Sequence, residues 1–243
     1  MSKQSGLGDQ LLIDGYLLSG DIGSLSRIGG GPAALDMTGI DKEAFERKGG
    51  LLTGAIEFTS FFNDAAGQAH PVLSALPTTD RYVTYLRGSG IGKGAASILA
   101  VQVGYDPSRG QDGSLTMNTS AQSTGGIPLE WGEQLTAGVR TDTAATNGAS
   151  LDGGAATTFG GSAYLHVLAV TGTSVTVTLQ DSADNSSWAN ITGGAFTAAT
   201  ARGAQRLTVA GTVRRYVRAI TSGTFTNAQF VVAFTRHLTA MSY

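Results

Sequence analysis

Glycine and polar residues break the opening of the chain into short extended pieces. Residues 5–34 read SGLGDQLLIDGYLLSGDIGSLSRIGGGPAA, and no long apolar run follows the early basic residue Lys3, so this is not the pattern of a signal peptide. A backbone that is interrupted so often cannot hide its own N–H and C=O groups, and buried ones need hydrogen-bond partners. We therefore expect this segment to be loose or to pair with another strand, including one from a neighbouring copy of the chain.

The composition supports a β-rich subunit that buries part of its surface in an assembly. Glycine accounts for 35 of the 243 residues, about twice the average usage, whereas only 14% of residues are charged. The hydrophobic share of 41% excludes a disordered chain. A net charge of −2 provides no basic excess for holding nucleic acid through its phosphates. The absence of cysteine excludes disulfides and thiolate metal sites and fits folding in a reducing cytoplasm.

Alternating residues predict a β-sandwich in the second half. Val175, Val177 and Leu179 face one way, and Ser174, Thr176, Thr178 and Gln180 face the other. A strand over 164–170 would precede this one through a hairpin at 171–173, and Ala228, Phe230, Val232 and Phe234 would line one face of a final strand. A strand over 213–220 has two possible facings: either Val213, Val217 and Ala219 point inward, or Tyr216 and Ile220 do.

The first half has a more mixed pattern. We expect strands over 56–62, 81–86, 97–103 and 114–121, together with two short helices over 42–48 and 72–76. Small polar residues fill 143–161, which we interpret as a linker or an entry segment. The predicted organisation is thus a first domain over 1–142, the linker 143–161, and a C-terminal β-sandwich over 162–243 that the first domain does not need for its own assembly.

Several blocks of the first half resemble one protein family. The opening segment, DKEAFERKGG (41–50), GQAHPVLSALPTTDRYVTYLRG (67–88) and GYDPSRGQDGSL (104–115) resemble the major tail tube proteins of long-tailed, siphovirus-like actinobacteriophages. The resemblance implies a mainly β fold, a tail-tube β-sandwich or barrel with one or two short helices, followed here by the C-terminal sandwich, which we expect on the exterior of the tube. It also implies a structural virion protein of the tail, assembled in the host bacterial cytoplasm. Such subunits stack as rings, commonly homohexameric, into a tube that conducts DNA without binding it specifically. The implied partners are other copies of the chain and tail proteins such as the tape measure and the tail terminator, with no membrane.

Two glycine-rich segments are the predicted assembly loops. Residues 87–94 resemble a phosphate-binding loop, but Arg87 stands where the first glycine belongs and Gly94 replaces the magnesium-binding hydroxyl. We therefore interpret this stretch as a flexible loop that contacts a neighbouring copy, as we do for 19–32. The residues assigned to these loops are Ser19, Gly29, Gly30, Gly31, Pro32, Gly88, Gly90, Gly92, Lys93 and Gly94.

Other candidate sites have simpler structural interpretations. Asp181, Asp184 and Asn185 could ligate calcium through oxygen, and Trp188 could stack on a glycan, but a hydrogen-bonded turn explains the same residues. Glu130 and Glu133 flank Trp131, which we interpret as surface charges beside a core tryptophan rather than as a sugar-cleaving pair. No catalytic motif is found, so we expect neither an enzyme nor a cofactor.

Two other functions stay open at this stage. The second half could be a carbohydrate- or cell-surface-binding β-sandwich module, since ARGAQRLTV (201–209) and VRRYVRAI (213–220) faintly resemble galactose-binding jelly-roll domains. The chain could also be a head decoration protein. Binding to a glycan array would favour the module, whereas rings or tubes that form without ligand would favour the tail tube.

Overall fold

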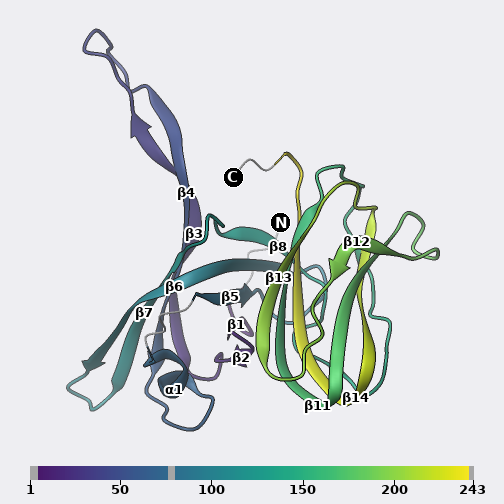
Figure 1. Ribbon diagram of the computed structural model, residues 1–243. Coiled ribbons are helices and arrows are strands. Elements are labelled where there is room, and N and C mark those ends of the chain that lie inside the picture. Colours follow the sequence, from purple (N-terminus) through teal and green to yellow (C-terminus); the bar gives the residue numbers. More distant parts are fainter. Residues whose placement is uncertain (1–4, 76–79, 241–243) are drawn as a thin grey trace.

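The computed structural model describes residues 5–75 and 80–240, and nearly all of its regular structure is β (Figure 1). The mainly β fold class is therefore confirmed. In chain order the strands are β1 (Gln10–Ile13), β2 (Tyr16–Leu17), β3 (Ile22–Asp36), β4 (Arg47–Phe61), β5 (Arg81–Leu86), β6 (Gly94–Arg109), β7 (Leu115–Ser123), β8 (Glu130–Gln134), β9 (Arg140–Asp142), β10 (Leu151–Asp152), β11 (Gly161–Ser182), β12 (Ala189–Ala195), β13 (Gly203–Val209) and β14 (Tyr216–Arg236). Among the described residues the one helix is α1 (Ala69–Leu73).

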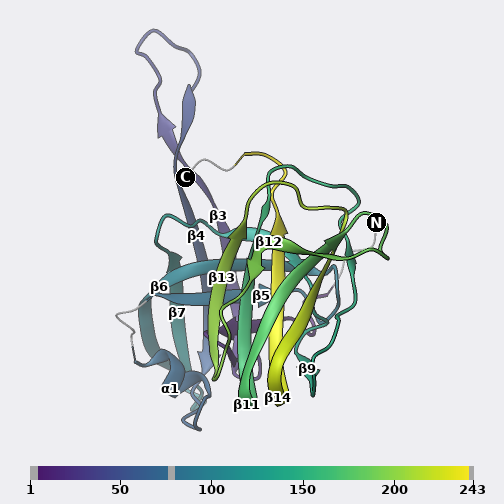
Figure 2. The same ribbon diagram turned by 45° about the vertical axis from the view of Figure 1, so that its right-hand side comes forward.

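The first half is a strongly curved antiparallel sheet in the order β3–β4–β7–β6–β5–β1–β2. Its core includes Leu11, Ile56, Phe58, Val83 and Ile98, all less than 4% exposed. The helix α1 packs its buried apolar side chains against this core, and its position beside the sheet is visible in Figure 2. The sheet therefore surrounds one apolar centre rather than lying flat.

Hydrogen bonds from the sheet hold α1 in place. Arg81 Nη1 donates to the carbonyl of Val72 at 2.7 Å, and Gln102 Nε2 donates to the carbonyl of Leu73 at 2.8 Å. At the other end, the Asp21 carboxylate accepts the backbone N–H of Ala69 at 2.9 Å. These contacts satisfy terminal helix groups that would otherwise lack partners. The helix expected over 72–76 thus forms slightly earlier in the chain, and residues 76–79 lie outside the described part.

The helix expected over 42–48 is wrong, because this stretch closes the hairpin between β3 and β4. The Asp36 carboxylate accepts hydrogen bonds from the backbone N–H and the hydroxyl of Thr38, and the Thr38 hydroxyl in turn accepts the N–H of Glu46. Short polar side chains that bond to nearby backbone groups compete with helix formation. The local helical spacing therefore yields to the pairing of the flanking strands.

Two very long strands, β11 and β14, build the second half. They pair from Gly161↔Arg236 to Ser182↔Tyr216, with register shifts near Gly172, where both strands bend over. Each strand therefore contributes to both layers of the sandwich. Figure 1 shows the two strands as a curved pair of ribbons. The alternating residues predicted to point inward, Val175, Val177, Leu179, Ala228, Phe230, Val232 and Phe234, all lie in the shared core, as predicted.

The expected hairpin at 171–173 is wrong, since β11 continues through it for 22 residues. Gly172 has a φ of +131°, and a Cβ there would lie 2.5 Å from the Cα of Phe225. The glycine thus permits a bend and a close strand approach without a chain reversal. The ambiguous facing of 213–220 is also settled, because Val213, Val217 and Ala219 are fully buried.

The strand β8 joins the two halves. On one side it pairs with β6, from Gly94↔Glu133 to Ser97↔Glu130, and on the other it pairs with β14 at Phe234↔Glu133. A third apolar cluster fills the junction and contains Leu12, Leu86, Ala95, Val231 and Ala233. Removing the second half would expose Leu12, Leu86 and Ala95 of the first half, which argues against the second half being dispensable.

The predicted linker 143–161 runs along the second half. Within it, β10 pairs with β14 at Leu151↔Val217 and Asp152↔Tyr216, and an isolated bridge joins Thr157 to Val213. This segment is thus part of the second half's hydrogen bonding. The division into domains 1–142 and 162–243 stays a prediction.

A buried histidine also links the two halves through hydrogen bonds. His166 is fully buried on β11; its Nδ1 accepts the backbone N–H of Gly15 at 3.2 Å, and its Nε2 donates to the Thr84 hydroxyl at 2.9 Å. The backbone donor at Nδ1 fixes the neutral Nε2–H tautomer. Burial lowers the pKa of His166 to about 3, so the ring stays uncharged at neutral pH.

A second buried polar cluster centres on Glu130 of β8, whose side chain is 2% exposed. Its carboxylate accepts hydrogen bonds from Tyr164 and from Arg206, and His237 Nε2 lies 3.5 Å from it. The interpretation of Glu130 as a surface charge is therefore wrong, as is that of Trp131 as a core residue, because Trp131 is 54% exposed. Successive side chains of β8 point to opposite faces.

The first prediction concerns the buried ion pair. Replacing Arg206, whose side chain is 10% exposed, by Leu leaves the Glu130 carboxylate buried without its cation. We expect the free energy of unfolding to fall by about 3–5 kcal/mol, measured by urea denaturation. The control Arg215→Leu breaks an ion pair with Asp152 that is largely exposed, so its midpoint should stay near that of the wild type. Equal losses in both variants would contradict the assigned role of the cluster.

The second prediction concerns acid stability. The native state keeps His166 neutral down to a pKa of about 3, whereas the unfolded chain protonates it near its ordinary value of 6.5. The unfolded state therefore binds the extra proton, and stability is lost as the pH falls from about 6.5 towards 3, at up to about 1.4 kcal/mol per pH unit. Urea unfolding at several pH values should show this slope in the wild type and a shallower one in His166→Gln. Identical slopes in the wild type and in His166→Gln would refute the assignment of this pH dependence to His166.

Candidate assembly surface

The β3–β4 hairpin projects from the body of the molecule. The strand β4 pairs with β7 only from Phe61 to Ala55, whereas its pairing with β3 continues out to Asp36↔Arg47. Beyond Ala55 the hairpin is thus a two-stranded ribbon that stands clear of the sheet in both views (Figures 1 and 2). An isolated two-stranded hairpin is at best marginally stable in water.

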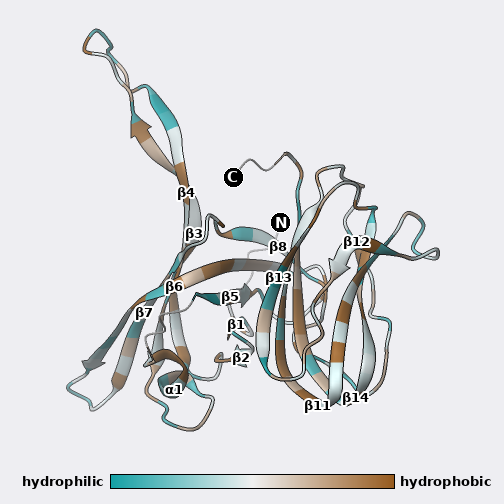
Figure 3. Ribbon diagram, viewed as in Figure 1, coloured by the Kyte–Doolittle hydropathy of each residue, from teal (hydrophilic) through white to brown (hydrophobic). Residues whose placement is uncertain are grey.

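Large apolar side chains on this ribbon are exposed. They are Leu35 (50%), Met37 (58%), Ile40 (110%), Phe45 (70%), Leu51 (86%) and Leu52 (47%). Figure 3 shows hydrophobic colour at the outer end of β3 beside the hydrophilic start of β4. Clustered apolar exposure on one element marks an interaction site. The sequence alone does not reveal this cluster, because the pairing of β3 with β4 brings the six residues onto one ribbon. Only Phe45 lies within the helix expected over 42–48.

The glycines 29–31 lie at the root of this ribbon and not in a loop, so the loop expected there is wrong. Gly30 pairs with Gly54, and a Cβ on Gly30 would lie 2.2 Å from the Thr53 carbonyl oxygen and 2.7 Å from the Gly54 Cα. A Cβ on Gly54 would in turn lie 2.6 Å from the Cβ of Leu129. Glycine is therefore required where the two strands approach closely and leave the sheet. Pro32 follows within β3, opposite Leu52.

The strand β3 is also an edge strand. Over the described residues, no strand pairs with the side of β3 that faces away from β4. Its 15 residues thus present unpaired backbone groups, which natural proteins cover or use for pairing with another chain. Few charged side chains protect this edge, since Arg27 and Asp36 are the only ones on it.

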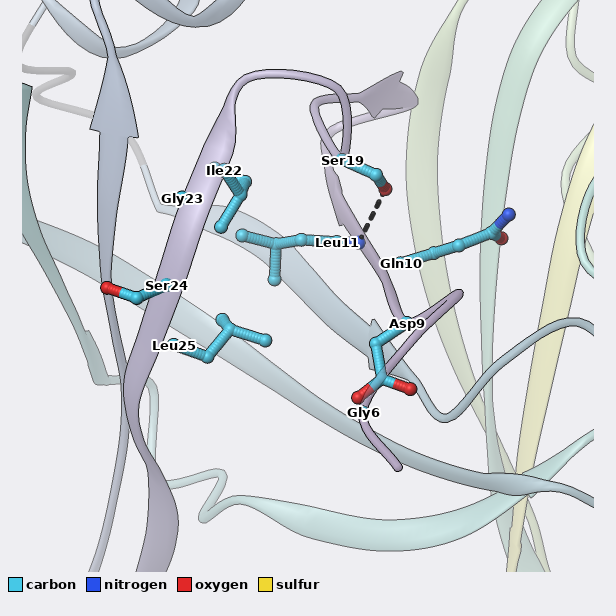
Figure 4. A pocket seen from close by; sticks show the side chains of 9 residues that line it. All are labelled: Gly6, Asp9, Gln10, Leu11, Ser19, Ile22, Gly23, Ser24 and Leu25. Carbon is cyan, nitrogen blue, oxygen red and sulfur yellow. Dashed lines mark hydrogen bonds between the residues drawn. The ribbon is translucent and has the colours of Figure 1, made fainter. Parts of the chain in front are cut away.

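A groove of about 330 Å³ separates β3 from the N-terminal segment (Figure 4). The side chains of Leu11, Ile22 and Leu25 point toward one another across it in the figure. Ser19 lies at its end, where its hydroxyl accepts the backbone N–H of Leu11 at 3.0 Å. Ser19 thus closes the turn after β2, and whether it also contacts a neighbouring copy stays a prediction.

The loop 88–94 is held by its own chain rather than standing free. Gly88 donates its N–H to the Asp9 carboxylate at 3.1 Å, and Gly92 donates to the Gln134 carbonyl at 2.9 Å. Gly90 accepts the N–H of Lys93 at 3.1 Å, and Gly94 already belongs to β6. The expected flexible loop is thus an ordered turn beside β8. Of the predicted loop residues here, Lys93 is the exposed one.

The candidate calcium residues have separate partners. The Asp181 carboxylate accepts the N–H and the guanidinium of Arg214, at 2.6–2.8 Å. Asp184 accepts the N–H groups of Ser187 and Ser186, which hold the pKa of Asp184 well below its usual range. Asn185 occupies the left-handed region with a φ of 61°. The geometry therefore favours the hydrogen-bonded turn. In the described part of the chain, no group of three or more His, Cys, Asp or Glu is arranged to hold a metal ion.

No family model and no curated protein matches this chain. Among solved structures, the virion of a native gene transfer agent particle contains a chain that is 14% identical; the match covers 52% of this chain and 98% of that one, with a TM-score of 0.42. The SPP1 Dit protein, described as a hub adsorption apparatus protein, is 11% identical over 95% of this chain and 99% of its own, with a TM-score of 0.33. A chain of the phage p2 baseplate is 7% identical over 94% and 98%, with a TM-score of 0.33. These similarities are too low to assign a function.

One further finding concerns membranes. Among residues 5–75 and 80–240, no helix is long and apolar enough to cross a bilayer.

The third prediction tests the root of the ribbon. The substitution Gly30→Ala places a methyl group against the Thr53 carbonyl, so the strands must separate there, and we expect faster amide hydrogen exchange in the ribbon. Gly29→Ala is the matched control, because a Cβ on Gly29 meets no atom within 4 Å. Hydrogen exchange followed by mass spectrometry distinguishes the two. Unchanged exchange in Gly30→Ala would show that the close approach is not needed.

Proposed function

We propose that this chain is a structural subunit of a phage tail that assembles with copies of itself into stacked rings forming the tail tube. The observation that supports this most is the uncovered β3–β4 ribbon with its exposed apolar side chains. A second support is the resemblance of the first half to tail tube proteins. It comes from separate blocks of sequence and does not depend on this geometry.

The energetics favour a covered ribbon. Burying a side chain of the size of Leu or Phe gains about 1.5–3 kcal/mol, so the six exposed side chains together offer on the order of 10 kcal/mol. That is comparable with the cost of bringing two proteins together, about 4–15 kcal/mol. A ribbon on one copy must meet a different surface on the next, and such a heterologous contact can close into a ring. Each subunit in a ring then has two such contacts.

The resemblance supplies the finer features of the proposal. The rings would be hexameric, and the tube would be located in the virion tail after assembly in the host cytoplasm. Tape-measure and tail-terminator proteins would be further partners. DNA would pass through without specific binding, which agrees with a net charge of −2. A non-enzymatic role is part of the same proposal.

A head decoration protein is the alternative that self-association alone does not exclude. It would also use exposed apolar surface, but it would bind a capsid rather than stack on itself. Negative-stain electron microscopy of the purified protein distinguishes the two, since tubes with a regular axial repeat support the tail tube.

The fourth prediction tests the ribbon as the assembly element. Replacing Leu35, Ile40 and Phe45 together by Ser removes apolar surface without touching a buried side chain, so the variant should fold but stay monomeric in sedimentation velocity. The control Leu238→Ser removes a side chain that is 77% exposed and lies off the ribbon, and it should assemble like the wild type. Tubes formed by the triple variant would overturn the proposed role of the ribbon.

A further inference from the structure

A row of polar side chains crosses the face of the second half. Gln180 of β11 lies directly opposite Asn190 of β12 and Arg218 of β14, so all three side chains share one face of neighbouring strands. Gln180 Nε2 donates to Asn190 Oδ1 at 2.9 Å, and its Oε1 accepts from Arg218 Nε and Nη2 at 2.9 and 2.7 Å. The guanidinium lies 4.2 Å from the centre of the Trp188 ring. The row is therefore a connected and rigid unit.

Arg218 differs from the nearby arginines in the groups that bind its guanidinium. Arg206, Arg214 and Arg215 each bond to a carboxylate, and Arg236 donates to three backbone carbonyls. Among the described residues, Arg218 has neither a carboxylate nor a backbone carbonyl partner. A neutral amide and an aromatic ring fix its position, and neither one neutralises its charge.

The free groups of this row determine what it can bind. Arg218 Nη1 and the Asn190 amide nitrogen have no partner among the described residues, and both are donors. The ligand must therefore offer acceptor oxygens, and a positioned guanidinium favours a carboxylate or a phosphate. Because Arg218 is already held in place, little side-chain entropy is lost when such a group binds.

We propose that Arg218, Asn190 and Trp188 form a binding site for an acidic saccharide, a sugar unit that carries a carboxylate or a phosphate. Arg218 covers one face of the Trp188 ring, and the exposed remainder of this partly exposed side chain offers apolar ring surface to the C–H groups of a sugar. Trp and Arg also anchor protein interfaces, but the buried core of such an interface is a larger apolar patch, which this face does not provide. The exposed large hydrophobic residues described in this half, Phe159 and Leu238, lie outside β11, β12 and β14.

The test uses the full-length protein with defined probes and ligand-observed NMR, which detects weak binding. The probes are trigalacturonic acid, its neutral methyl ester, glucose 1-phosphate and an N-acetylated Glu-Glu dipeptide. We expect trigalacturonic acid or glucose 1-phosphate to bind with a Kd on the order of 1 mM or below, and the ester and the peptide to bind at least about tenfold more weakly. Comparing the two acidic sugars tells carboxylate from phosphate recognition.

Two variants connect binding to the site. Arg218→Gln removes the cation. Gln180→Glu replaces the amide by a carboxylate of the same size, which pairs with Arg218 and no longer donates to Asn190. Each variant should weaken binding about tenfold or more. Arg215→Gln is the matched control, because it removes the same charge from an arginine that is paired with Asp152, and it should bind like the wild type. Urea midpoints near that of the wild type confirm that the variants fold.

Several results would overturn this proposal. These are no binding of either acidic sugar at concentrations on the order of 10 mM, equal loss in Arg215→Gln and Arg218→Gln, and full binding by Gln180→Glu. Binding of the Glu-Glu peptide as tight as that of the sugars would assign the site to a protein partner instead.

Discussion

The strand β8 is hydrogen-bonded on both sides, to β6 of the first half and to β14 of the second, and the arrangement of the whole molecule depends on these two short ladders. They place the long strands of the second half beside the curved sheet of the first, which allows Leu12 and Val231 to share one apolar cluster. They also bring Glu130 to Arg206, which is remote in sequence. A buried carboxylate is tolerated there because it is paired and hydrogen-bonded, so the ladders and the polar cluster stabilise each other.

Stability is distributed unevenly as a consequence. The junction combines a shared apolar cluster, the neutral His166 and a buried ion pair, whereas the outer part of the β3–β4 ribbon has only its own ladder. Elements with few buried contacts open at the lowest free energy and are the ones that rearrange on binding. The close approach of Gly30 and Gly54 lies between the body of the molecule and the outer part of the ribbon, where few contacts are buried. A partner that covered the ribbon would supply the packing that the chain itself does not provide.

The sequence predicts those parts of this fold that follow from the two-residue alternation of side chains along a strand. Val175 to Leu179 alternate so regularly that their burial could be predicted without a structure. For the final strand the sequence predicts the inward face of Phe230, Val232 and Phe234, but the burial of Val231 and Ala233 on its other face depends on packing against the first half. The continuity of β11 could not be predicted. A glycine at position 172 is compatible with a hairpin turn or with a bend inside one strand, and only its close approach to β14 decides between them. The same holds for the candidate sites, since the row Asn190–Gln180–Arg218 depends on the register of three strands. The sequence did single out Trp188, but not Arg218, which has no carboxylate partner and lies over the Trp188 ring.

The two proposed surfaces impose different requirements on an assembly. The ribbon leaves the first half and needs a receiving surface on another copy, so its contacts lie between subunits. The row at Arg218 lies on the second half, on the opposite side of the β8 junction from β3 and β4, and needs access to solvent. Both conditions hold together when the first halves pack around the ring and the second halves face outward. In that arrangement each ring displays one copy of the Arg218 site per subunit, and stacked rings repeat it. Repetition raises the avidity of a weak site for a polymer by orders of magnitude, so under both proposals millimolar binding by one subunit would be sufficient for the assembled rings to engage an acidic glycan.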